Sequence, residues 1–261
     1  MTFTALIAAA LRHDCGFVCD VPLEWHQGRT AYGGFSSAVA LTAAMEVGGP
    51  GLPPLRSAAI SFVGPVFGEI DVRAGVLRRG KNATWIAAEI TREGDVVFTA
   101  TFAFMRPVPS TIQLNDCLPP DGIISLENAS FYRSHPMMPA FIANHFEVAF
   151  AQPKSSEKRP ELCWWVRLKD RAAIDPMAEM LLVADTLPPG VLPLMSPGTP
   201  VSSMTWQVNM LTAAPHTRDG WWLLQSAGDY AENGCSSQVM RMWNADCQPI
   251  MAGMQAIALF G

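Results

Sequence analysis

The sequence predicts an α+β protein of two similar halves, each combining one buried helix with a series of antiparallel strands. Two observations support this fold class. The 261-residue chain is 49% hydrophobic and 16% charged, which is enough apolar material for a sizeable core. An apolar helical segment followed by strand-like runs also occurs twice along the chain. We interpret this repeated order as an internal duplication.

The first predicted helix runs from Phe35 to Glu46. Its apolar residues cover nearly the whole circumference, and Ser36, Ser37 and Thr42 are only mild exceptions. A helix with this pattern is surrounded by protein rather than lying on a surface. We therefore expect a sheet to wrap around it.

Strand-like runs follow this helix and are separated by short turns rich in glycine. The runs are Arg56–Val63, Glu69–Leu77, Thr84–Thr91 and Val96–Met105. Consecutive strands joined by short turns predict an antiparallel meander.

The segment Pro107–Asn144 is rich in proline and has no sustained periodicity, which indicates a linker or a long crossing connection. We accordingly divide the chain into an N-terminal half (1–110), a linker (111–144) and a C-terminal half (145–261).

The second predicted helix begins at Asp175, an N-cap residue, followed by Pro176 at the first helical position. It extends to about Leu187, where Pro188-Pro189-Gly190 ends it. The strands predicted after it are Val201–Leu211, Trp221–Gly228, Ser237–Trp243 and Pro249–Phe260.

Charge and composition exclude several classes of function. A net charge of -5 leaves no broad basic field for nucleic acid, and no apolar run is long enough to span a membrane. The opening segment Met1–Arg12 lacks the basic flank of a secretory signal, so we expect a cytoplasmic protein. The six cysteines show neither CxxC pairing nor zinc-finger spacing from histidines, so we expect free thiols and no metal site.

Three short motifs suggest a family. Tyr32-Gly33-Gly34 opens the first helix, Val183-Ala184-Asp185-Thr186-Leu187-Pro188 ends the second, and Ala252-Gly253-Met254-Gln255 lies in the last strand. Together with the order of elements over residues 20 to 260, they resemble the acyl-CoA thioesterase II family. The resemblance implies a double hot-dog fold, in which two antiparallel sheets are each wrapped around a central helix.

The resemblance also implies a site in the second half, where an Asp, a Ser or Thr and a Gln hold the hydrolytic water. The glutamine matches Gln255. The Asp of the family falls on Thr205 when the strand is matched without gaps, which is a departure from the pattern. The hydroxyl position falls near Tyr230.

Gln255 shares a strand face with apolar residues, so its amide must find hydrogen-bond partners there. It either orients a water or braces a neighbouring strand. Thr205 belongs to the polar face of its strand, which is either exposed to solvent or the wall of a cleft between the halves. A hydroxyl can position a water but is too weak a base to activate one. The residues expected on the opposite, core face are Met204, Trp206, Val208 and Met210.

Asp185 is the carboxylate that we expect to compensate for Thr205. It lies near the C-terminus of the second helix, where the macrodipole disfavours negative charge. Its spacing from Leu181 and Leu182 aims it at an apolar face, where a carboxylate needs partners and burial raises its pKa. The alternative is that Asp185 caps the turn at Thr186-Leu187.

Substrate-binding residues are expected in the first half. Gly33 and Gly34 leave the leading N–H groups of the first helix uncovered, as an oxyanion site requires. The alternative is that they allow close packing between helix and sheet. His26 is a candidate base or an ordinary loop histidine.

Arg78, Arg79 and Lys81 form a basic cluster at one turn, and either bind the phosphates of coenzyme A or are simply solvated. The pairs Trp164-Trp165 and Trp221-Trp222 place one aromatic ring on each face of their strands, so one ring of each pair is expected in the core.

These residues favour a thioester hydrolase acting on an acyl-CoA. In this interpretation Gln255 and a hydroxyl residue hold the water, and backbone amides stabilise the oxyanion. No cofactor is expected. The alternative is a non-catalytic acyl-CoA or acyl-ligand binding protein of the same fold. A hot-dog dehydratase is the third hypothesis and ranks last, because no histidine-rich site segment is present. Free sheet edges also allow homo-oligomers.

Overall fold

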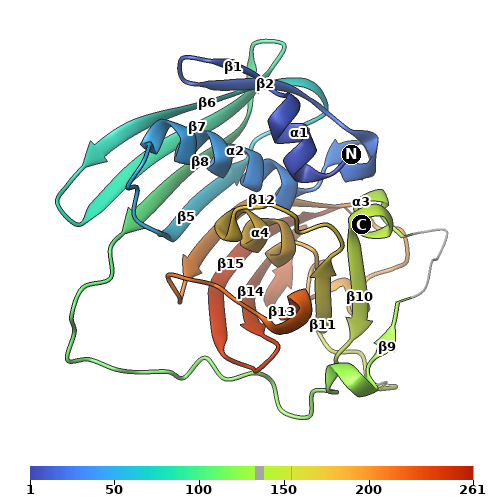
Figure 1. The fold of residues 1–261 in the computed structure, drawn as a ribbon. Helices are drawn as coiled ribbons and strands as arrows, with labels where there is room; N and C mark the ends of the chain where they lie inside the picture. Colours follow the sequence, from blue (N-terminus) through green and yellow to red (C-terminus); the bar gives the residue numbers. More distant parts are fainter. Residues whose placement is uncertain (133–137, 154, 261) are drawn as a thin grey trace.

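A computed structural model describes residues 1–132, 138–153 and 155–260 and confirms the α+β class. Its main feature is an antiparallel sheet in the order β1-β2-β6-β7-β8-β5-β12-β15-β14-β13-β11-β10-β9 (Figure 1). The strands are β1 (Leu11–His13), β2 (Gly16–Val21), β5 (Leu55–Phe62), β6 (Gly68–Arg79), β7 (Ala83–Arg92), β8 (Asp95–Met105), β9 (Ser130–Phe131), β10 (Phe146–Phe150), β11 (Glu161–Leu168), β12 (Val201–Met210), β13 (Trp221–Glu232), β14 (Cys235–Asn244) and β15 (Pro249–Leu259). A small second sheet pairs β3 (His26–Gln27) with β4 (Thr30–Ala31).

Among the described residues, the helices are fewer than the strands. The α-helices are α1 (Phe3–Ala9), α2 (Gly33–Gly48), α3 (Ala140–His145) and α4 (Pro176–Ala184). Single 3-10 turns occur at η1 (Leu23–Trp25), η2 (Leu126–Asn128), η3 (Leu192–Leu194) and η4 (Arg218–Gly220). Among the described residues, no helix is both long and apolar enough to cross a membrane.

The sheets of the two halves are joined, which corrects the expectation of two sheets. Strand β5 of the first half pairs with β12 of the second, from Ser57 opposite Asn209 to Ser61 opposite Thr205. Each strand supplies the backbone partners that the other would lack at a sheet edge. Hydrophobic alternation predicts which face of a strand is buried but not which strand lies beside it, so the sequence did not reveal this pairing.

Helices α2 and α4 lie side by side on one face of the sheet (Figure 1). As predicted, α2 is buried around most of its circumference, and it is one turn longer than expected because it begins at Gly33 and ends at Gly48. Its many alanines let the sheet and α4 approach closely from different sides.

Helix α4 begins as the sequence predicts. The side chain of Asp175 accepts hydrogen bonds from the backbone N–H groups of Met177 (2.8 Å) and Ala178 (3.3 Å), which would otherwise lack partners. The helix ends at Ala184, sooner than the proline-based prediction, and Asp185 is its C-cap.

Register shifts occur in several of the strand ladders, and two of them affect residues of the predicted site. The ladder between β12 and β15 shifts register between Ser203 and Thr205, and the ladder between β13 and β14 shifts between Gly228 and Tyr230. The extra residue in β12 is Met204, which was predicted to face the core and is 39% exposed. That prediction is wrong because a β-bulge breaks the alternation of the strand.

The segment that follows β8 crosses the outer face of the second half. The backbone carbonyls of Cys117 and Ile124 accept hydrogen bonds from the indole nitrogens of Trp243 (2.7 Å) and Trp165 (2.9 Å). Both rings of each tryptophan pair are buried. Trp164 and Trp222 pack in the core on the helix side, whereas Trp165 and Trp221 belong to a second apolar cluster that this segment helps to cover.

Candidate functional site

The site is built around Asp185, where the C-terminal end of α4 meets the N-terminal end of α2. The side-chain amide of Gln255, on β15, donates a hydrogen bond of 2.7 Å to the Oδ1 atom of Asp185. The backbone of Gly34, in the first turn of α2, also hydrogen-bonds the carboxylate. Both halves of the chain therefore contribute to one acid group.

Burial changes the acidity of this group. Although part of the Asp185 residue is exposed, the surrounding protein encloses the carboxylate, and this burial raises its pKa from 3.8 to about 7. The hydrogen bonds from Gln255 and Gly34 act in the opposite direction. The N-terminus of α2 also favours the negative charge that the end of α4 disfavours. A carboxylate with this pKa is partly ionised at neutral pH and is basic enough to accept a proton from water.

Asp185 caps α4 only through its backbone N–H, which donates to the carbonyl of Val183, and its carboxylate does not bond the turn that follows, as the alternative interpretation supposed. The hydroxyl of Thr186 does so by donating to the backbone carbonyl of Val183 at 2.7 Å. The Asp185 carboxylate is thus held by the site rather than by the helix end.

The glycine pair at the start of α2 allows this close approach. A Cβ atom on Gly33 would lie 2.6 Å from the Oδ2 atom of Asp185, and one on Gly34 would lie 2.8 Å from the carbonyl oxygen of Leu181. Tyr32, just before the pair, donates a hydrogen bond of 2.9 Å to the carbonyl of Leu182 and fixes the same junction. The close packing is between two helix ends and also between helix and sheet, as the packing alternative supposed, because a Cβ atom on Gly33 would lie 2.8 Å from the ring of Phe62 on β5.

A second glutamine, which the sequence did not single out, fixes the orientation of Gln255. The Oε1 atom of Gln238, on β14, accepts hydrogen bonds from the backbone N–H of Gly190 (2.8 Å) and the hydroxyl of Ser226 (3.0 Å). Its amide nitrogen must therefore point the other way, and it donates to the Oε1 atom of Gln255 at 3.0 Å. This leaves the amide nitrogen of Gln255 facing Asp185.

Gln238 is directly opposite Gln255 in the ladder between β14 and β15 and is 1% exposed. A polar residue at a core position of the predicted strand was the signal that could have identified it. Ser236 lies two residues earlier on the same strand and hence on the same face. Its hydroxyl is buried and has no partner among the described residues, so it is a hydroxyl that could contact a bound water.

Thr205 lies on the opposite face of the sheet from Gln255. Its neighbour Trp206 is the direct partner of Gln255 and is buried, whereas Thr205 is exposed. The ungapped match had implied that Thr205 and Gln255 hold the same water. The structure places their side chains on opposite faces of the sheet instead.

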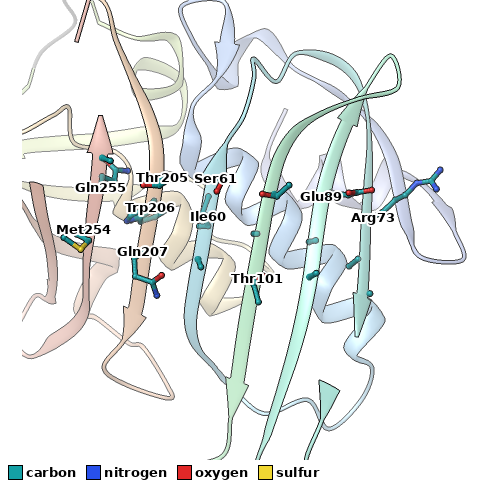
Figure 2. A pocket seen from close by; sticks show the side chains of 18 of the residues that line it. Ile60, Ser61, Arg73, Glu89, Thr101, Thr205, Trp206, Gln207, Met254 and Gln255 are labelled. Carbon is teal, nitrogen blue, oxygen red and sulfur yellow. The ribbon is translucent and has the colours of Figure 1, made fainter. Parts of the chain in front are cut away.

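Thr205 instead lines a hollow of about 800 Å³ that crosses the junction of the two halves. Figure 2 shows the hollow extending from Met254 and Thr205 across the sheet to Glu89 and Arg73. Its outward-facing residues between these ends are mostly alanine, serine and threonine. The buried carboxylate of Asp185, with Gln255 as its hydrogen-bond partner, lies instead on the helix side of the sheet.

Tyr230 is also outside the site. It is 57% exposed, and its hydroxyl donates a hydrogen bond to Glu232 at 2.6 Å. A register shift lies just before Tyr230, in the region where the family match had placed the hydroxyl only approximately.

His26 is buried on β3, and its Nε2 atom has no partner among the described residues. Burial lowers its pKa, so it is neutral at physiological pH. No hydrogen bond of the described residues connects it to Asp185 or Gln255.

The basic cluster lies at the far end of α2. Arg79 donates a hydrogen bond of 2.7 Å to the carbonyl of Gly48, and Arg78 stacks over the ring of Trp85. Since α2 has 16 residues, its two ends are about 24 Å apart at a rise of about 1.5 Å per residue. The cluster, which includes Lys81, is therefore separated from Asp185 by the length of the helix.

Comparisons with known proteins agree with this architecture. The family model for the acyl-CoA thioesterase N-terminal domain matches residues 21–105, and that for the C-terminal domain matches residues 120–259. No curated protein matches the chain.

Solved structures resemble the chain over its full length. A conserved hot-dog protein of unknown function from Alicyclobacillus acidocaldarius has a TM-score of 0.85 and 18% identity, covering 100% of this chain and 99% of that one. The TesB protein of Mycobacterium avium subs. paratuberculosis gives 0.77 and 18%, with 98% of each chain covered. The acyl-CoA thioesterase II TesB2 of Mycobacterium marinum gives 0.74 and 14%, with 99% and 97% covered. At these identities the structures show the shared fold, and the two family models, which together match most of the sequence, show that the chain belongs to the acyl-CoA thioesterase family.

Proposed function

We propose that this protein hydrolyses the thioester bond of an acyl-CoA and that Asp185 is the general base. The observation that carries the proposal is the pair formed by Asp185 and Gln255, in which a partly ionised carboxylate is hydrogen-bonded at 2.7 Å to an amide of fixed orientation. Family membership supports the substrate class.

The amide nitrogen of Gln255 carries two protons. One is donated to Asp185, and the second can be donated to the oxygen of a water beside the carboxylate. In this position Asp185 accepts a proton from the water as its oxygen attacks the thioester carbonyl. The tetrahedral intermediate then collapses, the carbon–sulfur bond breaks, and the proton held by Asp185 passes to the departing thiolate.

The developing oxyanion requires donors. The start of α2 at Gly33 supplies the nearest helix N-terminus, and its positive end favours negative charge. The N–H of Gly34 is bonded to Asp185, so we assign oxyanion stabilisation to the helix end as a whole rather than to Gly34. Contact between the coenzyme A phosphates and Arg78, Arg79 or Lys81 remains a prediction.

The alternative, a binding protein without turnover, rested on the missing carboxylate at Thr205. Asp185 removes that reason, because it places a carboxylate directly on Gln255. A site holding a base of this pKa is suited to proton transfer, whereas ligand binding alone does not require one.

Release of free thiol from a panel of acyl-CoAs tests the proposal. We expect turnover by the wild-type protein and a loss of at least about a hundredfold in kcat for Gln255→Ala, because the water loses its orientation. Thr205→Val is the matched comparison, since it removes a hydroxyl from the other face and should keep activity. Calorimetric binding of acyl-CoA without any turnover would instead support the binding protein. If Thr205→Val lost activity and Gln255→Ala kept it, the active site would lie on the outer face of the sheet.

A further inference from the structure

A second group of reactive side chains lies at the edge of the large sheet, where the hairpin between β1 and β2 lies beside β6 (Figure 1). The Sγ atom of Cys15 is 3.6 Å from the Nδ1 atom of His13, and the Nε2 atom of His13 is 2.9 Å from the Oδ1 atom of Asp71. A thiol, an imidazole and a carboxylate therefore lie in hydrogen-bonding sequence, which is the arrangement of an activated nucleophile.

The hydrogen bonds define which nitrogen of His13 is basic. The backbone N–H of Cys15 approaches Nδ1 at 3.4 Å, so this nitrogen is an acceptor and the proton is on Nε2, from which it is donated to Asp71. Arg73 holds Asp71 in place through its Nε atom at 2.9 Å. Nδ1 thus faces the thiol with its lone pair, and the carboxylate stabilises the imidazolium that forms when a proton is taken up.

The thiol is held in position and remains accessible. The carbonyl of Cys15 accepts a hydrogen bond of 2.8 Å from the backbone N–H of Ala74, which ties the hairpin turn to β6. Cys15 and His13 are both partly exposed, whereas Cys19 and Cys163 are buried. A reagent in solution can therefore reach Cys15.

A hollow of about 490 Å³ lies next to this group and shares Asp71 and Arg73 with it. Four carboxylates and one guanidinium line it. These are Glu69, Asp71, Glu89, Glu93 and Arg73. The excess of negative charge favours a positively charged or neutral reactant over an anionic one.

We propose that Cys15 is a nucleophilic thiol that exchanges with low-molecular-weight disulfides, cationic ones in preference to anionic ones. His13 removes the proton from Sγ, and the thiolate attacks one sulfur of the disulfide. A new sulfur–sulfur bond to Cys15 forms as the original one breaks, and the leaving thiolate takes the proton from His13. Cys15 is thereby oxidised to a mixed disulfide, and the departing half of the reagent is reduced to a thiol.

Cystamine, a small cationic disulfide, is the probe for this reaction. The reduced wild-type protein is incubated with it at neutral pH and quenched with acid, and peptide mass spectrometry follows modification of each cysteine with time. Cys235 is the internal reference, because it is exposed and has no hydrogen bond to a histidine among the described residues. We expect Cys15 to react at least about tenfold faster than Cys235, since general-base assistance contributes about a hundredfold or more in enzymes.

His13→Asn should lower the rate at Cys15 to that of Cys235, while the rate at Cys235 stays unchanged and shows that the protein is folded. Asp71→Asn should lower it as well, because His13 loses the group that stabilises its charged form. With the dianionic disulfide of nitrobenzoate, the advantage of Cys15 over Cys235 should shrink. Equal rates for Cys15 and Cys235 with cystamine, or a fast Cys15 in His13→Asn, would overturn the proposal.

Discussion

Replacing Asp185 by asparagine should remove the base and at the same time stabilise the protein at alkaline pH. The carboxylate has a pKa of about 7 in the folded protein, against 3.8 for an ordinary Asp. The folded state therefore keeps a proton that the unfolded chain has already released, and Asp185 makes the wild-type protein less stable as the pH rises from about 4 to about 7. Asparagine has a similar shape and no such proton.

The size of the effect follows from the pKa shift. About three pKa units at about 1.36 kcal/mol each give a difference of about 4 kcal/mol between wild type and Asp185→Asn above pH 7. This is an upper limit, because asparagine offers one acceptor oxygen for the donors that now share two. We expect a gain of about 2 kcal/mol in the free energy of unfolding at pH 8, and little difference near pH 4.

Urea unfolding of both proteins at pH 4, 6 and 8 measures this difference. Asp175→Asn is the matched control, because it changes an exposed Asp at the other end of α4 and asparagine is an equally good N-cap. Its stability should run parallel to that of the wild type. If Asp185→Asn also runs parallel to the wild type from pH 4 to 8, the raised pKa and the reasoning built on it are refuted.

Three further variants test other contacts. Gln238→Glu replaces the amide that orients Gln255 with a carboxylate, so Gln255 should no longer donate to Asp185. We expect the midpoint of the pH profile of activity to rise, because Asp185 loses this hydrogen bond. An unchanged midpoint would contradict the orienting role of Gln238. Gly33→Ala puts a Cβ atom 2.6 Å from a carboxylate oxygen of the site and should abolish activity and cost about 2 kcal/mol of stability, as followed by activity and thermal unfolding. Arg171 contacts the buried Glu179 at 2.7 Å, so Arg171→Met leaves this carboxylate without its ion-pair partner and should lower the free energy of unfolding in urea by about 3 kcal/mol. A loss below about 1 kcal/mol would show that water replaces the arginine.

The sequence predicted the features that depend on local pattern. The capping Asp175, the buried first helix and the apolar face around Gln255 all follow from residue type and spacing within one element. Asp185 was identified from the conflict between its charge and its position at a helix end. The structure resolves this conflict with the start of another helix, α2, which contributes Gly34.

The remaining features depend on how elements meet. Thr205 was chosen by matching its strand to the family without gaps, and Tyr230 by an approximate match. A register shift lies immediately before each of these residues. The ladder between β14 and β15 places Gln238 beside Gln255, and Ser226 bonds Gln238 from the next strand, β13. The pairing of β5 with β12 likewise joins residues about 150 positions apart, which no local periodicity can indicate.

The pH dependence of kcat/KM for acyl-CoA hydrolysis tests the central claim most directly, because it reports the ionisation of the base in the free enzyme. For the wild-type protein, the account predicts activity that rises through a midpoint near pH 7, where Asp185 loses its proton, and activity at least about a hundredfold lower in Asp185→Asn. A midpoint near pH 4, or an Asp185→Asn variant as active as the wild type, would contradict the assignment of Asp185 as the base.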